Sequence, residues 1–203
     1  MRTLGEALRR GTIRRLLIRG AGGIGKTALA RQLVTTLTEL GYRVLIYRAS
    51  DQRSFLTMLA QGLNMPEDTS LEQLSEPLAQ ELWVVWLDDW DCGEMNQAGD
   101  NAWFESLCRG GRDNLRVLLT SRVTVPLGQR RYLKDFYDYC LTPPDYNDFW
   151  RYTQHLGLPH PALQIRLMYK VLKGNFKGVQ LLQSLPLCTE GVGFRKQLAI
   201  VQR

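Results

Sequence analysis

The sequence predicts an α/β fold, because apolar segments of strand length alternate with segments of helical periodicity, as in a parallel sheet covered by helices. Two further observations support this class. A glycine-rich loop, "GAGGIGKT" (residues 20–27), separates the first strand-like segment from the first helix-like one, and two acids follow the apolar run at residues 82–87. We predict a three-layer sandwich with a five-stranded parallel sheet over residues 1–143, and a small helical lid over residues 144–203.

The glycine-rich loop matches G-x-x-x-x-G-K-[ST], the P-loop pattern, in which consecutive backbone N–H groups point at phosphate oxygens. We predict that Lys26 reaches the β- and γ-phosphates and that Thr27 offers its hydroxyl to Mg²⁺. The remaining residues around the phosphates are predicted to be Gly20, Ala21, Gly22, Gly23, Ile24, Gly25 and Ala28. The predicted class is therefore a P-loop NTPase with ATP or ADP and Mg²⁺ as cofactors, and the alternative is a glycine turn without a ligand.

The segments on either side of the loop have the required periodicity. "IRRLLIR" is predicted to be the first strand, and the stretch up to Gly41 a helix with one apolar face, made of Leu29, Leu33, Leu37 and Leu40. Residues 42–50 are predicted to form the second strand, apolar enough to be buried on both faces.

Two helices are predicted between the second and third strands. "SFLTMLAQGL" precedes a turn that contains Pro66, and "SLEQLSEPLAQEL" opens with the capping-box residues Ser70 and Gln73. Residues 82–87 are predicted to be a fully buried strand. It ends at Asp88 and Asp89, on the edge where open parallel sheets bind their ligands.

The remainder of the chain supplies two more strands and the lid. We expect a short helix around "NAWFESLCRGG", a fourth strand over residues 115–120 that leads to Ser121 and Arg122, and a loop over residues 123–136. "YDYCLTP" is predicted to be the fifth strand. Beyond Pro144, three helix-like segments predict the lid: "DYNDFWRYTQHLGL", "PALQIRLMYKVLKGN" and "FKGVQLLQSLP".

Composition excludes several classes of protein. Apolar residues make up 44% of the chain and charged residues 23%, as in ordinary globular proteins. The sequence has no apolar run of membrane-spanning length and no apolar core of a secretory signal, so we expect a cytoplasmic protein without a membrane partner. The four cysteines and two histidines are scattered, and we predict no disulfide and no metal other than Mg²⁺.

The net charge of +6 is concentrated before the first strand, at Arg9, Arg10, Arg14 and Arg15. One interpretation is a nucleic-acid contact. The interpretation that we favour is a set of solvated arginines whose stems cover apolar surface.

The polar ends of the predicted strands suggest a division of chemical roles. Asp88 is expected to hold Mg²⁺, because a hard cation that bridges phosphates needs a carboxylate within reach. Asp89 is expected to orient or deprotonate the attacking water, and Arg122 to contact the γ-phosphate. The catalytic residues are thus predicted to be Asp89, Lys26 and Arg122. The alternatives are a solvated pair of acids, and a surface arginine that caps a helix or pairs with an acid.

At this point the sequence resembles a known family. "GAGGIGKTALA", "VVWLDD", "LLTSR" and "KGNFKGVQLL" occur in the order and spacing of the STAND ATPases, which are signal-transduction relatives of AAA+ proteins and include the NB-ARC and NACHT modules of apoptosis and immunity. The resemblance covers nearly the whole chain. It implies a Walker A role for Lys26 and Thr27, a Walker B role for Asp88 and Asp89, and a sensor role for Arg122. It also implies the strand order 5-1-4-3-2 and a helical domain folded over the nucleotide.

The chain departs from this family in its lid. Where the family has a G-x-P triplet whose proline packs on adenine, this sequence has Gly174, Asn175 and Phe176. Phe176 either stacks on the base or belongs to the core of the lid, so the resemblance leaves adenine specificity open. Nothing after Pro186 resembles the family's winged-helix domain, so we favour an ATPase module excised from a longer protein.

Three functions remain. The favoured one is a nucleotide-dependent switch that gates attached effector and sensor domains, with homo-oligomerisation in the ATP state. The second is an AAA+-like motor or loader that acts on nucleic acid through the arginines before the first strand. The third is a small-molecule kinase, for which the sequence offers no arginine cluster in the lid.

Overall fold

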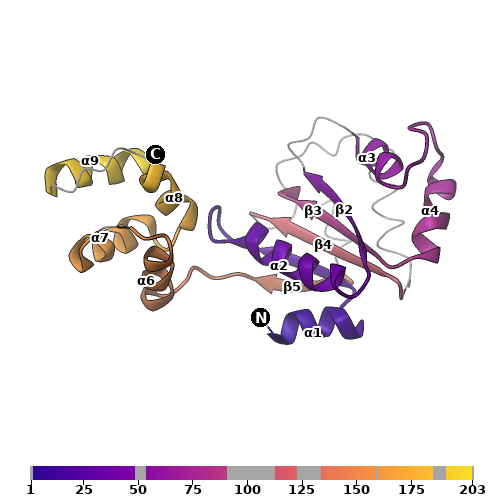
Figure 1. Ribbon diagram of the computed structural model, residues 1–203, viewed down its shortest axis with the longest axis horizontal. Helices are drawn as coiled ribbons and strands as arrows, with labels where there is room; N and C mark the ends of the chain where they lie inside the picture. Colours follow the sequence, from indigo (N-terminus) through magenta and orange to yellow (C-terminus); the bar gives the residue numbers. More distant parts are fainter. Residues whose placement is uncertain are drawn as a thin grey trace. The chain divides into compact units, whose positions relative to one another are not determined.

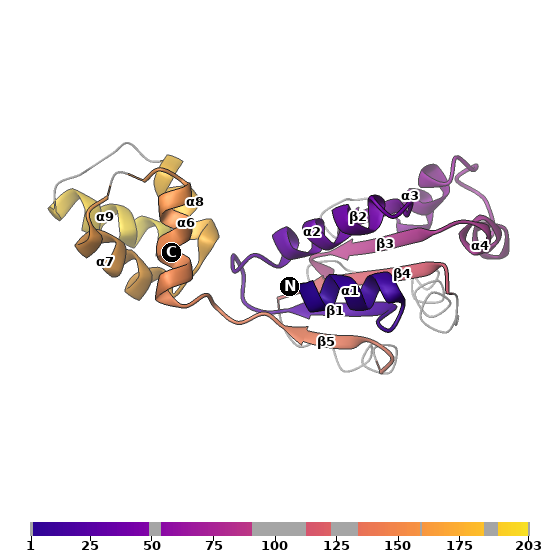
Figure 2. The ribbon, with the colours of Figure 1, turned by 60° about the horizontal axis from the view of Figure 1, so that its bottom comes forward.

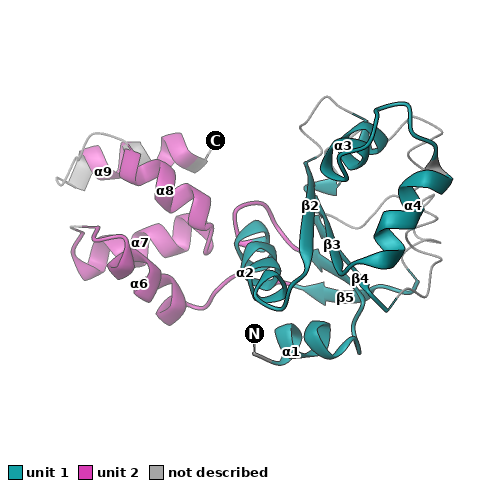
Figure 3. Cartoon of the chain, turned by 45° about the vertical axis from the view of Figure 1, so that its right-hand side comes forward, with its two compact units in different colours: residues 1–19, 26–140 teal, residues 20–25, 141–203 magenta. Residues whose placement is uncertain are grey.

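The computed structural model describes residues 2–48, 54–90, 113–122, 134–158, 160–184 and 191–202 of the 203-residue chain. The chain divides into two compact units (Figure 3). The sheet unit comprises residues 1–19 and 26–140, and the helical unit comprises residues 20–25 and 141–203. The predicted domain boundary after residue 143 lies close to the last of these divisions. The first six residues of the glycine-rich loop group with the helices, which the sequence did not suggest.

The sheet unit contains a parallel sheet of five strands in the order β2-β3-β4-β1-β5 (Figure 2). This order is the predicted 5-1-4-3-2 read from the other edge, so the predicted α/β fold class is confirmed. The strands are β1 (Arg15–Arg19), β2 (Arg43–Arg48), β3 (Trp83–Asp88), β4 (Leu115–Ser121) and β5 (Tyr137–Cys140).

Helices pack on both faces of this sheet. The helices are α1 (Arg2–Arg10), α2 (Lys26–Thr38), α3 (Phe55–Gly62) and α4 (Leu71–Gln80). Apolar residues of α3 and α4 share a core with Val85 and Val117 of the sheet. Their strand neighbours Val84 and Leu118 point to the opposite face, because side chains alternate along a strand, and α2 packs on β1, β3 and β4 there. The sheet unit therefore has three layers.

Burial along the strands follows their place in the sheet. Both β3 and β4 are buried along their whole length. This burial was predicted for the run at residues 82–87, of which Leu82 lies before β3 and is 40% exposed. The expectation that the second strand is buried on both faces is wrong, because β2 is an edge strand whose burial alternates and whose Ile46 is 40% exposed. Residues 49 and 50 of that predicted strand lie outside the described residues.

The predicted details of two helices, α4 and α2, have different outcomes. The capping box of Ser70 and Gln73 is present at the start of α4, as predicted. In α2, Leu29, Leu33 and Leu37 are buried, but Leu40 lies beyond the end of the helix and is 42% exposed, so its assignment to the apolar face is wrong.

A buried arginine attaches α1 to the sheet. Arg116 of β4 is 4% exposed, and its guanidinium donates hydrogen bonds to the carbonyls of Leu8 at 2.8 Å and Asp113 at 2.7 Å. It also lies 5.4 Å from the ring centroid of Tyr42. Burial lowers the pKa of Arg116 from its ordinary value, and these contacts offset the cost of burying the charge. The Leu8 carbonyl, in the last turn of α1, thus accepts from Arg116 as well as from the backbone N–H of Gly11 at 3.2 Å.

The helical unit contains α6 (Tyr146–His155), α7 (Ala162–Leu172), α8 (Phe176–Ser184) and α9 (Gly191–Gln202) (Figure 1). The first three occupy the predicted segments, whereas α9 was not predicted. All four helices contribute to one core, which includes Phe149, Ile165, Met168, Val179, Leu182, Phe194 and Leu198.

Two predicted features, the short helix around residues 101–111 and most of the loop at residues 123–136, lie outside the described residues. No helix in the described part of the chain combines the length and the apolar character that a membrane crossing requires.

Candidate nucleotide-binding site

The structure brings together the two residues that the sequence assigns to Mg²⁺. Asp88, the last residue of β3, is only 8% exposed. The hydroxyl of Thr27, in the first turn of α2, donates a hydrogen bond to Asp88 Oδ1 at 3.0 Å. A hydroxyl beside a carboxylate is a hard-oxygen donor set, and Mg²⁺ typically takes one or two such protein ligands together with phosphate oxygens and waters. The pair therefore fits the predicted metal.

Thr120 is a member of this cluster that the sequence analysis missed. Its side chain is fully buried in β4, and its hydroxyl donates to Asp88 Oδ1 at 2.6 Å and accepts from the backbone N–H of Asp89 at 2.9 Å. Thr120 thus orients the carboxylate of Asp88 and the backbone of Asp89 at once. The sequence does mark Thr120 in one way, because it is a hydroxyl residue directly after the apolar run at residues 117–119 of the predicted fourth strand.

Asp89 and Arg122 lie next to each other at the ends of β3 and β4. An Arg122 Nη atom is 3.4 Å from Asp89 Oδ2, and the two side chains are 49% and 39% exposed. Asp89 has a left-handed backbone, with φ of 52°, which is uncommon for a residue other than glycine. In the structure Arg122 therefore pairs with an acid, which was the alternative interpretation. The catalytic role of Asp89 and the sensor role of Arg122 remain predictions.

Lys26 is the first residue of α2 and is 6% exposed. Burying an ammonium group is costly unless an anion or several acceptors lie near it, so burial at a helix N-terminus is consistent with a phosphate-binding role. The described residues contain no group of three or more His, Cys, Asp or Glu side chains that could hold a metal ion by themselves.

The loop that precedes Lys26 has the backbone that its glycines permit. Gly23 has φ of 76° and Gly25 has φ of 102°, both in the left-handed region that favours glycine. A Cβ atom at position 23 would also overlap the side-chain amide of Asn175. At Gly23 the glycine is therefore required both by its backbone angle and by a close neighbour.

This neighbour belongs to the first turn of α8, which is hydrogen-bonded to the loop. The backbone N–H of Phe176 donates to the Gly23 carbonyl at 2.9 Å, and that of Lys177 donates to the same oxygen at 3.4 Å. The Asn175 side chain accepts from the N–H of Gly178 at 3.1 Å, as an N-cap residue does. The Gly23 carbonyl and Asn175 together satisfy the first N–H groups of α8.

Phe176 lies in an aromatic cluster of the helical unit. Its ring centroid is 4.4 Å from that of Tyr152 and 6.5 Å from that of Phe149. In the structure Phe176 thus packs in the core of the helical unit, which is one of the two roles that the sequence leaves open. Stacking of Phe176 on adenine stays a prediction.

The arginines before the first strand are engaged with acids. Arg9 and Arg10 lie 3.6 Å and 2.6 Å from the same carboxylate oxygen of Glu6, and Arg14 lies 2.5 Å from Asp113. Exposed pairs of this kind contribute little stability, and these two acids offset about half of the charge of the four arginines. The contacts agree with the interpretation of solvated arginines.

Comparison with known proteins identifies the fold. No protein-family model and no curated protein sequence matches this chain. Domain III of the Thermotoga maritima replication initiation protein DnaA superposes with a TM-score of 0.62 at 13% identity, over 98% of this chain and 88% of that one. The FIGL-1 AAA domain in complex with ADP superposes with a TM-score of 0.61 at 13% identity, over 93% of this chain and 72% of that one. Thermotoga maritima RuvB superposes with a TM-score of 0.57 at 12% identity, over 97% of this chain and 65% of that one. The chain therefore has the α/β fold of AAA-type P-loop ATPase domains.

Proposed function

We propose that this chain is a nucleotide-dependent molecular switch. It binds ATP or ADP with Mg²⁺, hydrolyses ATP slowly, and transmits the state of its phosphate loop to the helical unit. The observation that carries this proposal is the pair of hydrogen bonds from the N-terminus of α8 to the Gly23 carbonyl, supported by the fit of Asn175 against the same glycine. A loop that adjusts when phosphate binds or leaves changes the acceptor that α8 uses, so α8 responds directly to the bound nucleotide.

Each site residue has a physical role in this proposal. The loop N–H groups and Lys26 bind the phosphates, and Thr27 and Asp88 hold Mg²⁺, which neutralises charge on the phosphates. Asp89 acts on the attacking water. Arg122 contacts the γ-phosphate, and because it pairs with Asp89 in the structure, engaging the phosphate would exchange one anionic partner for another. This exchange couples recognition of ATP to the release of the catalytic acid.

The resemblance to STAND ATPases supports the wider role. On this proposal the chain is the nucleotide-binding module of a longer cytoplasmic protein, where it gates attached effector and sensor domains and forms homo-oligomers in the ATP state. The kinase alternative has no comparable support, because the proposed cluster contains residues for one nucleotide and none for a second substrate. The motor alternative relied on the arginines before the first strand, and Arg9 and Arg10 of α1 both pair with Glu6.

Hydrogen exchange of the α8 amides tests this function. We expect the exchange rates of the Phe176 and Lys177 amides to differ between the chain with MgADP and the chain with Mg²⁺ and a non-hydrolysable ATP analogue. The segment α4 serves as an internal control, and Lys26→Ala serves as the variant that folds but loses the phosphates. The measurement is exchange followed by mass spectrometry, with nucleotide binding measured in parallel by calorimetry.

The possible outcomes separate binding from switching. If the chain binds nucleotide and its α8 amides exchange at the same rate in every state, the P-loop binds but does not switch. If Lys26→Ala binds nucleotide as tightly as the original chain, the assignment of the phosphate site is wrong.

A further inference from the structure

The two units carry different charges. Within the described residues, the sheet unit has thirteen cationic and twelve acidic side chains, whereas the helical unit has seven cationic and two acidic ones. Most of the net positive charge of the described residues therefore lies on the helical unit, which carries +5 against +1 for the sheet unit. The sequence analysis looked for it in the segment before the first strand.

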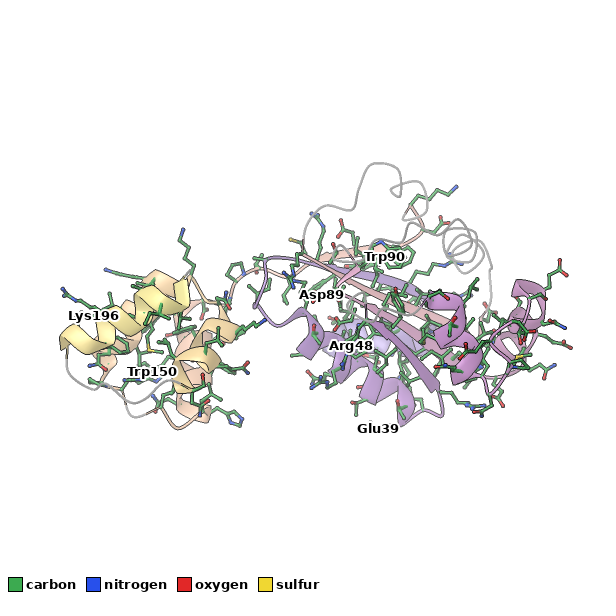
Figure 4. All side chains as sticks on the ribbon, turned by 90° about the horizontal axis from the view of Figure 1, so that it is seen from above. Glu39, Arg48, Asp89, Trp90, Trp150 and Lys196 are labelled. Carbon is green, nitrogen blue, oxygen red and sulfur yellow. The ribbon has the colours of Figure 1, made fainter. Side chains whose placement is uncertain are left out.

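Within the described residues of the helical unit, the acids lie at the start of α6. Asp145 accepts a hydrogen bond from the N–H of Asp148, and Asp148 lies 3.7 Å from Arg151. Residues 160–184 and 191–202 contain no Asp or Glu at all. The exposed cations of these two ranges are Arg166, Lys170, Lys173, Lys177, Arg195 and Lys196. Figure 4 labels Lys196 on α9 and Trp150 on α6. Such a surface lacks the interspersed charges that usually neutralise one another on a globular protein.

Three of these cations form a line along α7 and its C-cap. Arg166 and Lys170 lie four residues apart on one face of the helix, and Lys173 follows as the C-cap residue, with a left-handed backbone. The opposite face of α7 is committed to the core through Ile165, Met168 and Leu172. Leu163 is the one large apolar side chain of α7 that is exposed, and a single leucine is too little apolar surface for this helix to enter a lipid surface.

An aromatic groove begins where this line ends. The groove has a volume of about 540 Å³ and lies between the first turns of α6 and α7, where its lining includes Tyr146, Trp150, Leu163 and Arg166. The rings of Tyr146 and Trp150 have centroids 6.3 Å apart, and the Arg166 guanidinium lies 5.9 Å from the Tyr146 ring. Leu163 is 79% exposed, which is unusual for a leucine beside two half-buried rings.

We propose that this face of the helical unit, the groove together with the α7 cations, binds single-stranded nucleic acid. Unpaired bases would enter the groove against Tyr146 and Trp150, while Arg166, Lys170 and Lys173 contact successive phosphates. Aromatic rings beside a row of cations are the combination that single-strand binders use, because every base has a face to stack and every nucleotide a phosphate. A duplex keeps its bases stacked inside, so they cannot enter the groove and stack on Tyr146 and Trp150. An acidic protein would be bound by the cations alone and gives no reason for the two aromatic rings.

The test is fluorescence anisotropy of a labelled 20-nucleotide thymidine strand with the full chain in the absence of nucleotide. The double variant Lys170→Gln/Lys173→Gln removes two cations, and Leu163→Glu places a negative charge at the groove. We expect each to weaken binding by about tenfold or more at low salt. The original chain should show a slope of log K against log salt of about −2 for three contacts, and the double variant one of about −0.7, since each single-strand phosphate contributes about 0.7.

Matched controls locate the effect. Arg9→Gln/Arg10→Gln removes two cations from the sheet unit, and Ile200→Glu adds a charge at a 64% exposed position of α9. Both should bind the strand as the original chain does, and circular dichroism should show every variant folded. Equal affinity for a duplex overturns the single-strand assignment, and equal affinity for polyglutamate shows an acidic-protein surface instead. Unchanged binding by both groove-face variants overturns the proposed location.

Discussion

Asp88 is oriented by two hydroxyl groups from different elements, Thr27 at the start of α2 and Thr120 in β4. Burying a carboxylate to 8% exposure is costly, and charge-assisted hydrogen bonds offset part of that cost. Both hydroxyl groups approach Oδ1 most closely, while the nearer of the described donors to Oδ2 is Thr27 at 3.4 Å. The geometry leaves Oδ2 as the oxygen better placed to accept from a water on a cation.

Replacing Thr120 by valine should separate these effects, because valine keeps the shape and removes the hydroxyl. Thr120→Val leaves the N–H of Asp89 without this acceptor, and we expect a loss of about 1 to 3 kcal/mol in the free energy of unfolding together with weaker Mg²⁺-dependent ATP binding. Thr153→Val is the matched control, since Thr153 is equally buried and donates to the Trp150 carbonyl at 2.7 Å within the helical unit. Urea denaturation and calorimetric titration measure the two quantities. If both variants weaken ATP binding equally, Thr120 has no special place in the site.

Sequence reasoning found most of this cluster but not its connections. Thr27, Asp88, Asp89 and Arg122 were predicted because a motif or the end of an apolar strand marks each of them. Thr120 was missed because a threonine inside a strand is also a common core residue. The ion pair of Arg122 with Asp89 depends on β3 and β4 being neighbours in register, and sequence patterns leave many partners available to an exposed arginine.

Among the elements, α8 has an unusual start, because its first N–H groups use a carbonyl from the glycine-rich loop. The first N–H groups of a helix have no partner within it and are usually satisfied by a side chain or water. Here Asn175 supplies one acceptor and Gly23 the other. The loop and the helix are therefore constrained by each other.

Gly23→Ala should break this junction. The substitution forces alanine into a left-handed conformation, which costs about 1 to 2 kcal/mol, and places its Cβ against the Asn175 side chain. The matched control is Gly22→Ala, because a Cβ at Gly22 meets nothing within 4 Å. Without nucleotide, we expect Gly23→Ala to lower the unfolding midpoint and Gly22→Ala to change the free energy by less than about 0.5 kcal/mol. Adding Asn175→Ala should recover part of the loss, and additive effects of the two substitutions would show that the contact is not what Gly23→Ala disturbs.

The elements that the sequence missed owe their structure to packing. The helix α9 begins with the sequence "GVGF", a poor helix start, and it forms where Phe194 and Leu198 enter the core of the helical unit. Likewise, β2 has the composition of a buried strand but lies at the edge of the sheet, and no local pattern reports sheet position. By contrast β3 and β4 were predicted as strands, because each contains a run of apolar residues of strand length, as is typical of central parallel strands.

At the scale of the whole molecule, the chain passes between its two units at three places, after residues 19, 25 and 140. Residues 20–25 of the glycine-rich loop leave the sheet unit and group with the helical unit, where the Gly23 carbonyl accepts hydrogen bonds from the first N–H groups of α8. Sequence analysis treated the loop as part of the α/β domain, because contacts between distant segments are invisible to local patterns. On the proposed function, this junction is the place where we expect a change at the phosphates to reach α8.

On the proposed function, we expect Arg122 to distinguish ATP from ADP. A residue that contacts only the γ-phosphate stabilises the ATP form and leaves ADP affinity unchanged, because a ligand shifts an equilibrium only through interactions that differ between states. We expect Arg122→Ala to weaken binding of a non-hydrolysable ATP analogue by about 1.5 to 3 kcal/mol and binding of ADP by less than about 0.5 kcal/mol.

The control for this prediction is Arg43→Ala, which removes an arginine from the opposite end of the sheet, where it pairs with Glu81 at 2.7 Å, and should alter neither affinity. Turnover by the original chain should stay well below the roughly 10 per second typical of enzymes, because Arg122 must leave Asp89 before the acid can act. Calorimetry gives the two affinities and a phosphate-release assay gives the rate. Loss of ATP and ADP affinity together would make Arg122 a structural residue, and fast hydrolysis would make the molecule a motor, because a switch must keep its nucleotide long enough for its helical unit to be read.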